Sequence, residues 1–115
     1  MSIIDTTNTG DAFYNTFLGD ANCSGKIVLL SPTEYYNSVV IYCFGGSSRA
    51  REKIMKTRRA NVTKVERLKN LILCGEQLHM PWIDCNTRKQ EGLHRMMAIG
   101  DLYGWDYPVP VLIVT

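Results

Sequence analysis

The chain has 115 residues, of which 45% are hydrophobic and 21% are charged, and its formal net charge is +2. A chain of this size and composition forms one globular domain, and its apolar runs are too short for the roughly 20 residues of a membrane-spanning helix. The first residues lack the basic start and apolar stretch of an export signal. We therefore expect a cytoplasmic protein with no membrane contact, consisting of a single domain over residues 1–115 with an N-terminal extension over residues 1–25.

The cysteines are too far apart for a structural zinc site. They are Cys23, Cys43, Cys74 and Cys85, and no two are spaced as in the Cys-x-x-Cys pairs of zinc-binding motifs. Without an export signal, disulfides are not expected. The sequence therefore favours free thiols that pack as small apolar groups.

The first half of the chain predicts a helix, a strand and a second helix. Residues 10–19, "GDAFYNTFLG", read as a short helix between two glycines. Residues 26–31, "KIVLLS", form a dense apolar run of strand length. A helix follows, in which Ser31 is the N-cap, Pro32 the first helical residue and Glu34 the partner in a capping box.

A cationic segment follows a glycine- and serine-rich loop at residues 44–48. Residues 48–59 predict a helix, and residues 49–69 carry nine of the thirteen basic residues against two acidic ones, which gives this segment +7 and the rest of the chain −5. Two interpretations are open: a track for DNA, RNA or another anion, or a solvated helix face. The candidate nucleic-acid residues are Arg49, Arg51, Lys53, Lys56, Arg58 and Arg59.

A further helix is predicted to begin near Asn61 or Thr63. Thr63 and Glu66 have the spacing of a capping box, and Gly75 is expected just after the last helical residue. The apolar residues in between recur at helical spacing, which predicts one buried face. They are Val62, Val65, Leu68, Leu71 and Ile72.

The last third of the chain predicts a strand, a polar loop, a helix and a final strand. The strand is residues 80–85, "MPWIDC", and the loop is residues 86–90, "NTRKQ". The helix runs to about Tyr103, and the strand at 107–115 carries two prolines that keep its first residues from being central. The alternation of helices and strands predicts a small α/β domain with a mixed sheet and helices packed on both faces.

Potentially reactive side chains gather where the loop becomes the last helix. Glu91, Gly92, His94 and Arg95 occupy the start of "EGLHRMMAIG". The first amides of a helix lack partners and its dipole is positive there, so this end attracts anions. A glycine allows close approach of a phosphate, and an arginine can bind its oxygens. The alternative is an ordinary glycine turn with solvated or capping side chains.

The order of these motifs resembles the ParB/sulfiredoxin superfamily. The helix start and last strand, "EGLHRMMAIGDLYGWDYPVPVLIV", are similar to the family's turn of G-x-H-R type and the strand after it. Upstream, "VLLSPTEYY" resembles the opening of small ParB-like proteins, and "VERLKNLILCGEQLHMPWIDCN" resembles their helix, glycine and strand. The resemblance spans roughly residues 27–114, outside the N-terminal extension.

The resemblance implies a nucleotide site at this turn. Members of the superfamily use ATP, ADP or CTP, and some are reported to be nucleases. The expected cofactor of this chain is one of these nucleotides, with or without Mg²⁺. By correspondence of motifs, the nucleotide-binding residues are Gly92, Leu93, His94 and Arg95, and the candidate catalytic residues are Glu91, His94 and Arg95. Leu93 stands where sulfiredoxins carry their reactive cysteine, so sulfiredoxin activity is not expected. These 115 residues show no counterpart of the C-terminal domains with which partition proteins recognise DNA, so sequence-specific binding of a partition site is not expected.

Three functions remain open at this point. The first is nucleotide-dependent phosphoryl transfer or phosphodiester hydrolysis. The second is a nucleic-acid binder or nuclease that uses the cationic segment. The third is a non-catalytic phage or mobile-element protein that binds a host protein. Two carboxylates, Asp84 and Glu34, could serve a phosphoryl-transfer site, although Glu34 also fits the capping box. Four aromatic residues could stack on a base or belong to the core: Tyr35, Tyr36, Trp82 and Trp105.

Overall fold

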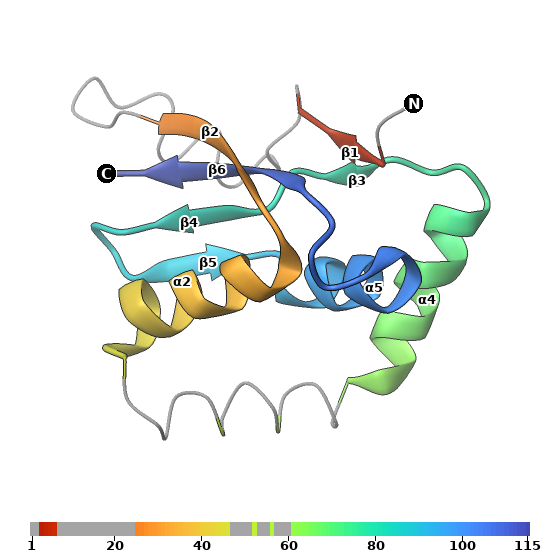
Figure 1. Ribbon diagram of the computed structural model, residues 1–115, viewed down its shortest axis with the longest axis horizontal. Coiled ribbons are helices and arrows are strands. Elements are labelled where there is room, and N and C mark those ends of the chain that lie inside the picture. Colours follow the sequence, from red (N-terminus) through yellow and green to blue (C-terminus); the bar gives the residue numbers. More distant parts are fainter. Residues whose placement is uncertain (1–2, 7–24, 47–51, 53–55, 57–60) are drawn as a thin grey trace.

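The computed structural model describes residues 3–6, 25–46, 52, 56 and 61–115, and in these ranges the chain is a small mixed α/β domain (Figure 1). Three described helices and six strands follow one another along the chain. Their bounds are β1 Ile4–Asp5, β2 Gly25–Leu30, α2 Pro32–Phe44, α4 Val62–Leu73, β3 Leu78–His79, β4 Trp82–Asp84, β5 Lys89–Glu91, α5 Leu93–Tyr103 and β6 Val109–Val114.

The main sheet has four strands in the order β2-β6-β4-β5. Strand β6 is antiparallel to β2 and parallel to β4, and β5 is antiparallel to β4, so the sheet is mixed as predicted. The first residues of β6 pair with β2 alone, because β4 joins only from Leu112 onwards. Pro110 lies in that half-paired stretch, which confirms that the strand is not central at its start.

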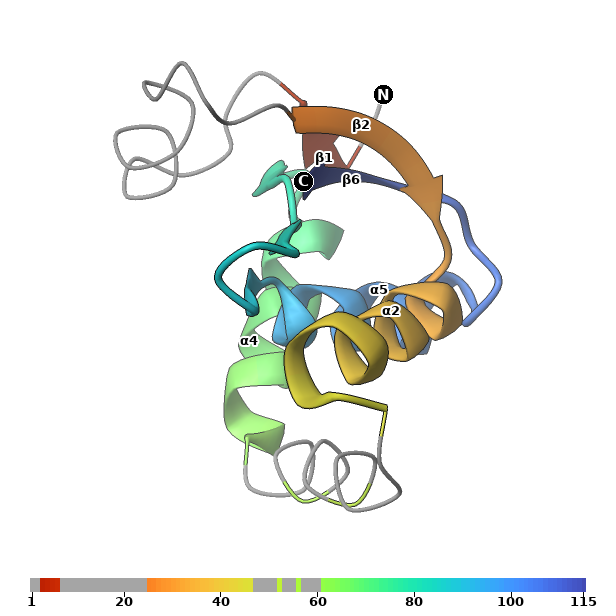
Figure 2. The ribbon, with the colours of Figure 1, turned by 90° about the vertical axis from the view of Figure 1, so that its left-hand side faces the viewer.

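The helices that the structure describes lie on one face of this sheet, with α2 and α5 beneath it and α4 beside α5 (Figure 2). The prediction of helices on both faces is therefore wrong for the described part of the chain. The strands explain the difference. Val109 and Val111 are fully buried on the helix-facing side, whereas Ile27 and Leu29, which share the opposite side, are half or more exposed.

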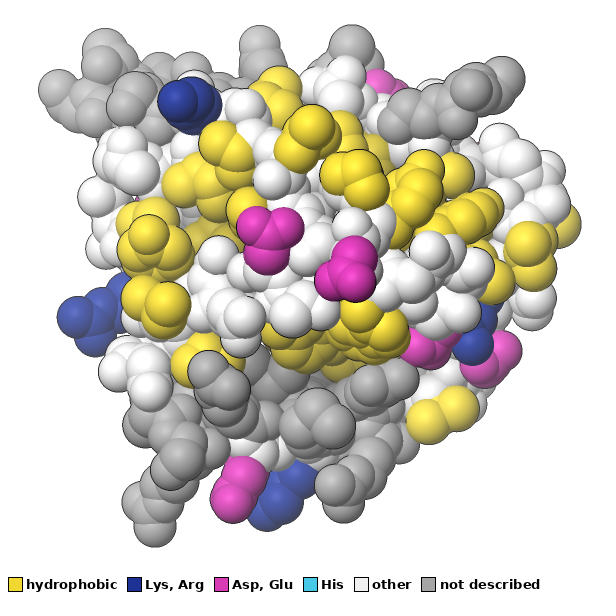
Figure 3. Space-filling model, in the orientation of Figure 1, with side chains coloured by type: hydrophobic (Ala, Val, Ile, Leu, Met, Phe, Trp, Pro, Cys, Tyr) yellow, Lys and Arg dark blue, Asp and Glu magenta, His cyan; other side chains and the backbone are white. Residues whose placement is uncertain are grey.

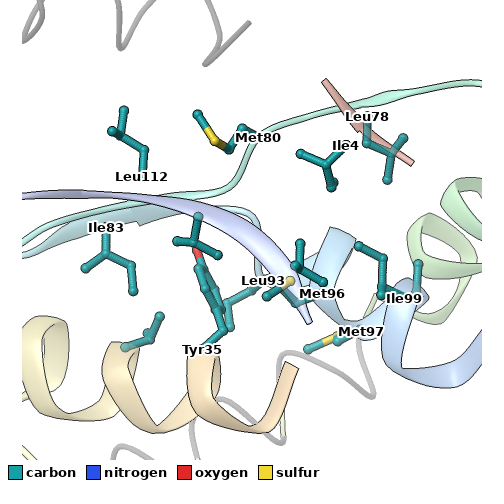
Figure 4. Packing of buried hydrophobic residues seen from close by; sticks show 14 of the residues in the cluster. Ile4, Tyr35, Leu78, Met80, Ile83, Leu93, Met96, Met97, Ile99 and Leu112 are labelled. Carbon is teal, nitrogen blue, oxygen red and sulfur yellow. The ribbon is translucent and has the colours of Figure 1, made fainter. Parts of the chain in front are cut away.

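The core fills the space between the sheet and the helices (Figure 4). Tyr35 of α2 and Ile83 of β4 point toward one another there and are completely buried. Met96 and Met97 of α5 are buried as well, as the sequence predicted for residues that follow the helix start. Leu112 and Met80 project from the other side of the sheet in the same view, and both are buried.

The helix boundaries agree with the sequence, but one of the two predicted capping boxes is absent. In α2, Ser31 Oγ accepts a hydrogen bond from the Glu34 amide, and Glu34 Oε1 accepts one from the Ser31 amide, each at 3.1 Å. In α4 the N-cap is Asn61, without a side-chain cap, so Thr63 is already helical and cannot form the expected box with Glu66. Gly75 follows the end of α4 as predicted.

Residues 86–90 are not all loop, because β4 and β5 form a tight hairpin. Lys89 and Gln90 belong to β5, where they pair with Asp84 and Ile83. The turn is held by the buried Asp84 carboxylate, which accepts hydrogen bonds from the Asn86 amide at 2.9 Å and from Thr87 Oγ1 at 2.6 Å. This network shortens the loop and starts a strand that polar residues alone did not indicate.

Part of the expected N-terminal extension joins the domain, since β1 pairs in parallel with β3 and Ile4 is buried in the core. The helix predicted at residues 10–19 lies outside the described residues. Of the helix predicted at residues 48–59, only Glu52 and Lys56 are described, and both are helical and exposed. None of the described helices has the length and apolar character required to cross a membrane.

Candidate functional site

The candidate site is the junction at which the β4–β5 hairpin leads into α5. Strand β5 ends at Glu91, Gly92 is the N-cap of α5, and the helix begins at Leu93. Gly92 has no side chain with which to cap the helix, and the amides of the first turn have no acceptors within their own helix. The junction therefore presents the positive end of the helix dipole, and the first turn of α5 contains neither a capping side chain nor an acidic residue.

Gly92 is required here for a reason that the sequence did not reveal. Its φ of 135° is rare for residues with a side chain, and a Cβ at this position would lie 2.6 Å from the Cβ of Pro81. Pro81 thus fills the space beside the Gly92 Cα that sequence reasoning reserved for a phosphate. A phosphate at this junction would therefore have to bind the first-turn amides that follow Gly92, which have no acceptor within their own helix.

Arg95 lies across the junction and ties it to the neighbouring β3. Its guanidinium donates to the His79 carbonyl at 2.9 Å and to the Glu91 carboxylate at 3.2 Å, and the arginine side chain is only 15% exposed. Glu91, with its side chain 62% exposed, is the outer partner. These two contacts use part of the five-donor capacity of a guanidinium, so the group keeps donors for a ligand.

His94 is a neutral imidazole within a cationic surrounding. Its Nε2 is buried and has no hydrogen-bond partner among the described residues. Burial lowers the pKa of His94, and the positive charges of Lys64 and Arg95 lower it further, while Glu91 has the opposite effect. The charge of Lys64, on α4, thus reaches the start of α5, which sequence reasoning had not connected.

The structure brings Glu91, Gly92, His94 and Arg95 together at one turn, as the sequence predicted. Leu93 differs from them, because its side chain is 6% exposed and belongs to the core. Any contribution of Leu93 to ligand binding would come from its backbone. Sequence reasoning therefore identified the position of the turn but not the burial of Leu93 or the contact of Arg95 with His79.

Tyr35 supports the junction from below, and sequence reasoning missed this role. Its hydroxyl has one proton and lies near three acceptors: Gln90 Oε1 at 2.9 Å, the Glu91 carbonyl at 3.2 Å and the Trp82 carbonyl at 3.4 Å. The shortest contact makes Gln90 Oε1 the main acceptor. Burial raises the pKa of Tyr35 well above its ordinary value, so the group remains a hydroxyl donor. The sequence contained one signal for this role: a tyrosine on the buried face of a predicted helix, whose hydroxyl needs a hydrogen-bond partner.

The other candidate residues have structural roles. Tyr36 and Trp105 contact each other edge to face at 5.5 Å between ring centroids, and both pack against the core, as does Trp82. The Asp84 carboxylate is engaged by its own turn. The described residues contain no group of three His, Cys, Asp or Glu side chains that could hold a metal ion.

The described cysteines are free thiols, as expected. Burial raises the pKa of Cys43 to about 11, and it raises the pKa of Cys85 as well. Both groups therefore stay protonated near neutral pH and are poor nucleophiles. Cys74 is exposed, and Cys23 lies outside the described residues.

The cationic segment is described only in part. Of the six candidate nucleic-acid residues, Lys56 is described and exposed. The remaining five, Arg49, Arg51, Lys53, Arg58 and Arg59, lie outside the described residues. Toward the end of the segment, Lys69 forms ion pairs with Glu66 at 2.8 Å and with Asp101 at 3.5 Å, so this lysine contributes to packing between α4 and α5.

Comparison of the chain with protein-family models, with curated proteins and with solved structures found no match. The residues of the junction and the motifs that they form are therefore the evidence for a function.

Proposed function

We propose that the start of α5 binds the phosphates of a nucleotide, as the resemblance to ParB-like proteins implies. The observation that carries the proposal is the first turn of α5, which has no side-chain cap and contains Arg95. The positive charge of Lys64 also acts at this turn, because it lowers the pKa of His94. Unpaired amides, a helix dipole and two cationic side chains are a favourable environment for an anion.

The side chains of the junction suit different parts of this task. Arg95 would bind phosphate oxygens with the donors that its contacts to His79 and Glu91 leave available. His94, held neutral, would act as a hydrogen-bonding group or as a base. Glu91 would orient Arg95, since an acidic group beside a phosphate otherwise repels it. The reaction class that fits is phosphoryl transfer or phosphodiester hydrolysis.

A magnesium ion would draw its ligands mainly from the nucleotide. Mg²⁺ commonly binds one or two carboxylates together with substrate phosphates and water. Glu91 is the acidic residue nearest in sequence to the proposed phosphate position. The sulfiredoxin reaction is not part of the proposal, because Leu93 is a buried aliphatic residue that cannot act as a nucleophile.

Thermal denaturation with ATP, ADP or CTP, each with and without Mg²⁺, tests the proposal. A ligand at 100 times its Kd stabilises the folded state by about 2.7 kcal/mol. We expect such a shift with one nucleotide, and we expect Arg95→Ala to reduce it strongly. Arg67→Ala is the matched control, because Arg67 is an exposed arginine on α4. The absence of a shift with all three nucleotides, or equal shifts in both variants, contradicts the proposal.

Binding of DNA or RNA by the cationic segment is the second candidate function. Lys64 and Arg67, which belong to it, are exposed and form no ion pair with another described residue. Phosphate contacts release counterions, so the affinity for a short DNA or RNA should fall steeply with salt. A binding constant independent of salt contradicts this function. If neither ligand class binds, the interaction with a host protein is the alternative to pursue.

A further inference from the structure

Strand β2 is an edge strand of the four-stranded sheet in the part of the chain that the structure describes. Among the described strands it has a neighbour on one side only, β6, with which it pairs without interruption from Gly25 to Leu30. Natural proteins block such edges with prolines, bulges or several charges, because the free backbone groups can pair with another chain. Strand β2 has no proline and no bulge, and its single charged residue is Lys26.

The same edge carries exposed apolar side chains. Ile27 is 50% exposed and Leu29 is 65% exposed, and the strand register places them on the face of the sheet opposite to Val109 and Val111, away from the described helices. In the orientation of Figure 1, hydrophobic side chains gather over the upper half of the molecule, where β2 and β6 lie (Figure 3). An open strand edge beside apolar side chains is a typical site for strand addition.

We propose that β2 pairs with β2 of a second copy of this chain, antiparallel and centred on Val28. Directly opposite residues of an antiparallel pair lie on the same face, and side chains alternate between faces along each strand. In a symmetric pair of identical strands, the two-fold axis must therefore pass through a residue and not between two residues. A centre at Val28 places Ile27 opposite Leu29 of the other copy, twice by symmetry, and Lys26 opposite Leu30. This register keeps Gly25, which has no side chain to contribute, out of the five paired positions.

Charge complementarity favours a second copy as the occupant. The Glu34 carboxylate lies 3.1 Å from the amide of Ser31, the residue that directly follows Leu30. In the proposed register, Lys26 of one copy is opposite Leu30 of the other and shares its face. A lysine side chain reaches about 6 Å, so its ammonium comes within range of Glu34. The symmetry gives two such ion pairs and keeps the two lysines at opposite ends of the interface.

The interface is small, and this determines the expected affinity. Five paired residues from each copy bury less than the roughly 1,200 Å² of a standard stable complex, so the dimer should be weak. A dissociation constant on the order of micromolar to millimolar is consistent with this size. Sedimentation velocity over a concentration series, up to about 1 mM, measures the association directly on the full chain.

One pair of matched variants tests the location of the interface. Leu29→Lys places a charge on the proposed interface and should give a monomer at all concentrations. Leu73→Lys is the control, since Leu73 is 67% exposed, lies at the end of α4 away from β2, and should leave the dimer intact. Both positions are on the surface, so folding should be retained. A wild-type chain that stays monomeric, or a dimer that survives Leu29→Lys, overturns the proposal.

A charge exchange tests the register. Lys26→Glu and Glu34→Lys should each weaken dimerisation about fivefold or more, since each replaces two attractive pairs by two repulsive ones. The double variant should recover most of the affinity, because it restores opposite charges. Glu34→Lys also removes a helix cap, so circular dichroism must first show that the variant is folded. Folded single variants without a double-variant recovery contradict the register centred on Val28.

Discussion

Replacing Gly92 with alanine tests the account of the junction most directly. The new Cβ would lie 2.6 Å from the Pro81 Cβ and 3.1 Å from the Pro81 Cα, and the φ of 135° is unfavourable for alanine. A strained backbone conformation costs about 1–3 kcal/mol, and overpacking in a filled space costs a similar amount. We therefore expect the free energy of unfolding to fall by about 2–6 kcal/mol, a large part of a small domain's stability.

Urea denaturation followed by circular dichroism measures this loss. With a slope near 1.5 kcal/mol per molar urea, the midpoint should fall by about 1–4 M. Gly104→Ala is the control, because Gly104 also has a positive φ, 107°, yet a Cβ there has no neighbour within 4 Å. The difference between the two variants reports the contact with Pro81. If Gly92→Ala costs no more than Gly104→Ala, the contact does not constrain the turn and the reasoning is refuted.

Three further predictions concern single side chains. The folded protein holds the pKa of His94 below the unfolded value of about 6.5, so the unfolded state binds the proton more tightly. The free energy of unfolding should therefore fall as the pH drops below about 6.5. His94→Gln should reduce that slope in denaturation midpoints measured from pH 7 to 5, and an unchanged slope counts against a buried neutral imidazole. Ser31→Ala should lower the free energy of unfolding by about 0.5–2 kcal/mol in thermal denaturation, because Ser31 caps α2. Thr63→Ala should lower it by less than about 0.5 kcal/mol, because Thr63 does not cap α4. Equal losses would indicate that Thr63 also caps its helix. Asp84→Ala should cost about 1–3 kcal/mol in urea unfolding by removing the acceptor of the hairpin turn, and Asp84→Asn, which keeps one acceptor oxygen, should cost less; the reverse order contradicts a structural role.

Local signals in the sequence predicted most of the described helices and strands. The start of α2 was predicted from Ser31 as the N-cap, Pro32 as the first helical residue and Glu34 as the partner of Ser31 in a capping box. All three residues occupy these positions in the structure. The last strand was predicted from its apolar residues. Its prolines indicated that its first residues would not pair with strands on both sides, and β4 pairs with it only from Leu112 onwards. These features depend on interactions within a few residues, which is why a single sequence is sufficient to reveal them.

The errors concern interactions between distant segments. The hairpin of β4 and β5 depends on Asp84 reaching the amides of its own turn, and a run of polar residues does not indicate that geometry. The arrangement of helices on one face depends on which side of each strand is covered. An apolar run such as "KIVLLS" looks equally suitable for a strand covered on both faces.

The position of the candidate site was predicted, but the contacts of its residues with other elements were not. The acid, glycine, histidine and arginine do meet at the start of α5, because a helix start keeps neighbouring residues together. The partners from other elements were not predictable, since nothing in the sequence places Pro81 against Gly92 or Tyr35 beneath the hairpin. These contacts arise from the packing of the sheet on the helices.

The position of β6 within the sheet also affects how the chain acquires its structure. It follows the other described strands in the sequence, yet it lies between β2 and β4, and its pairing joins Gly25 to Val114 across almost the whole described chain. During translation, β2 and the β4–β5 hairpin have no described strand with which both can pair until this strand leaves the ribosome. Contacts so distant in sequence are formed slowly. The nascent chain must therefore keep the apolar side chains of β2 in solution until β6 has been synthesised, and during this interval the strand is a suitable site for chaperone contact.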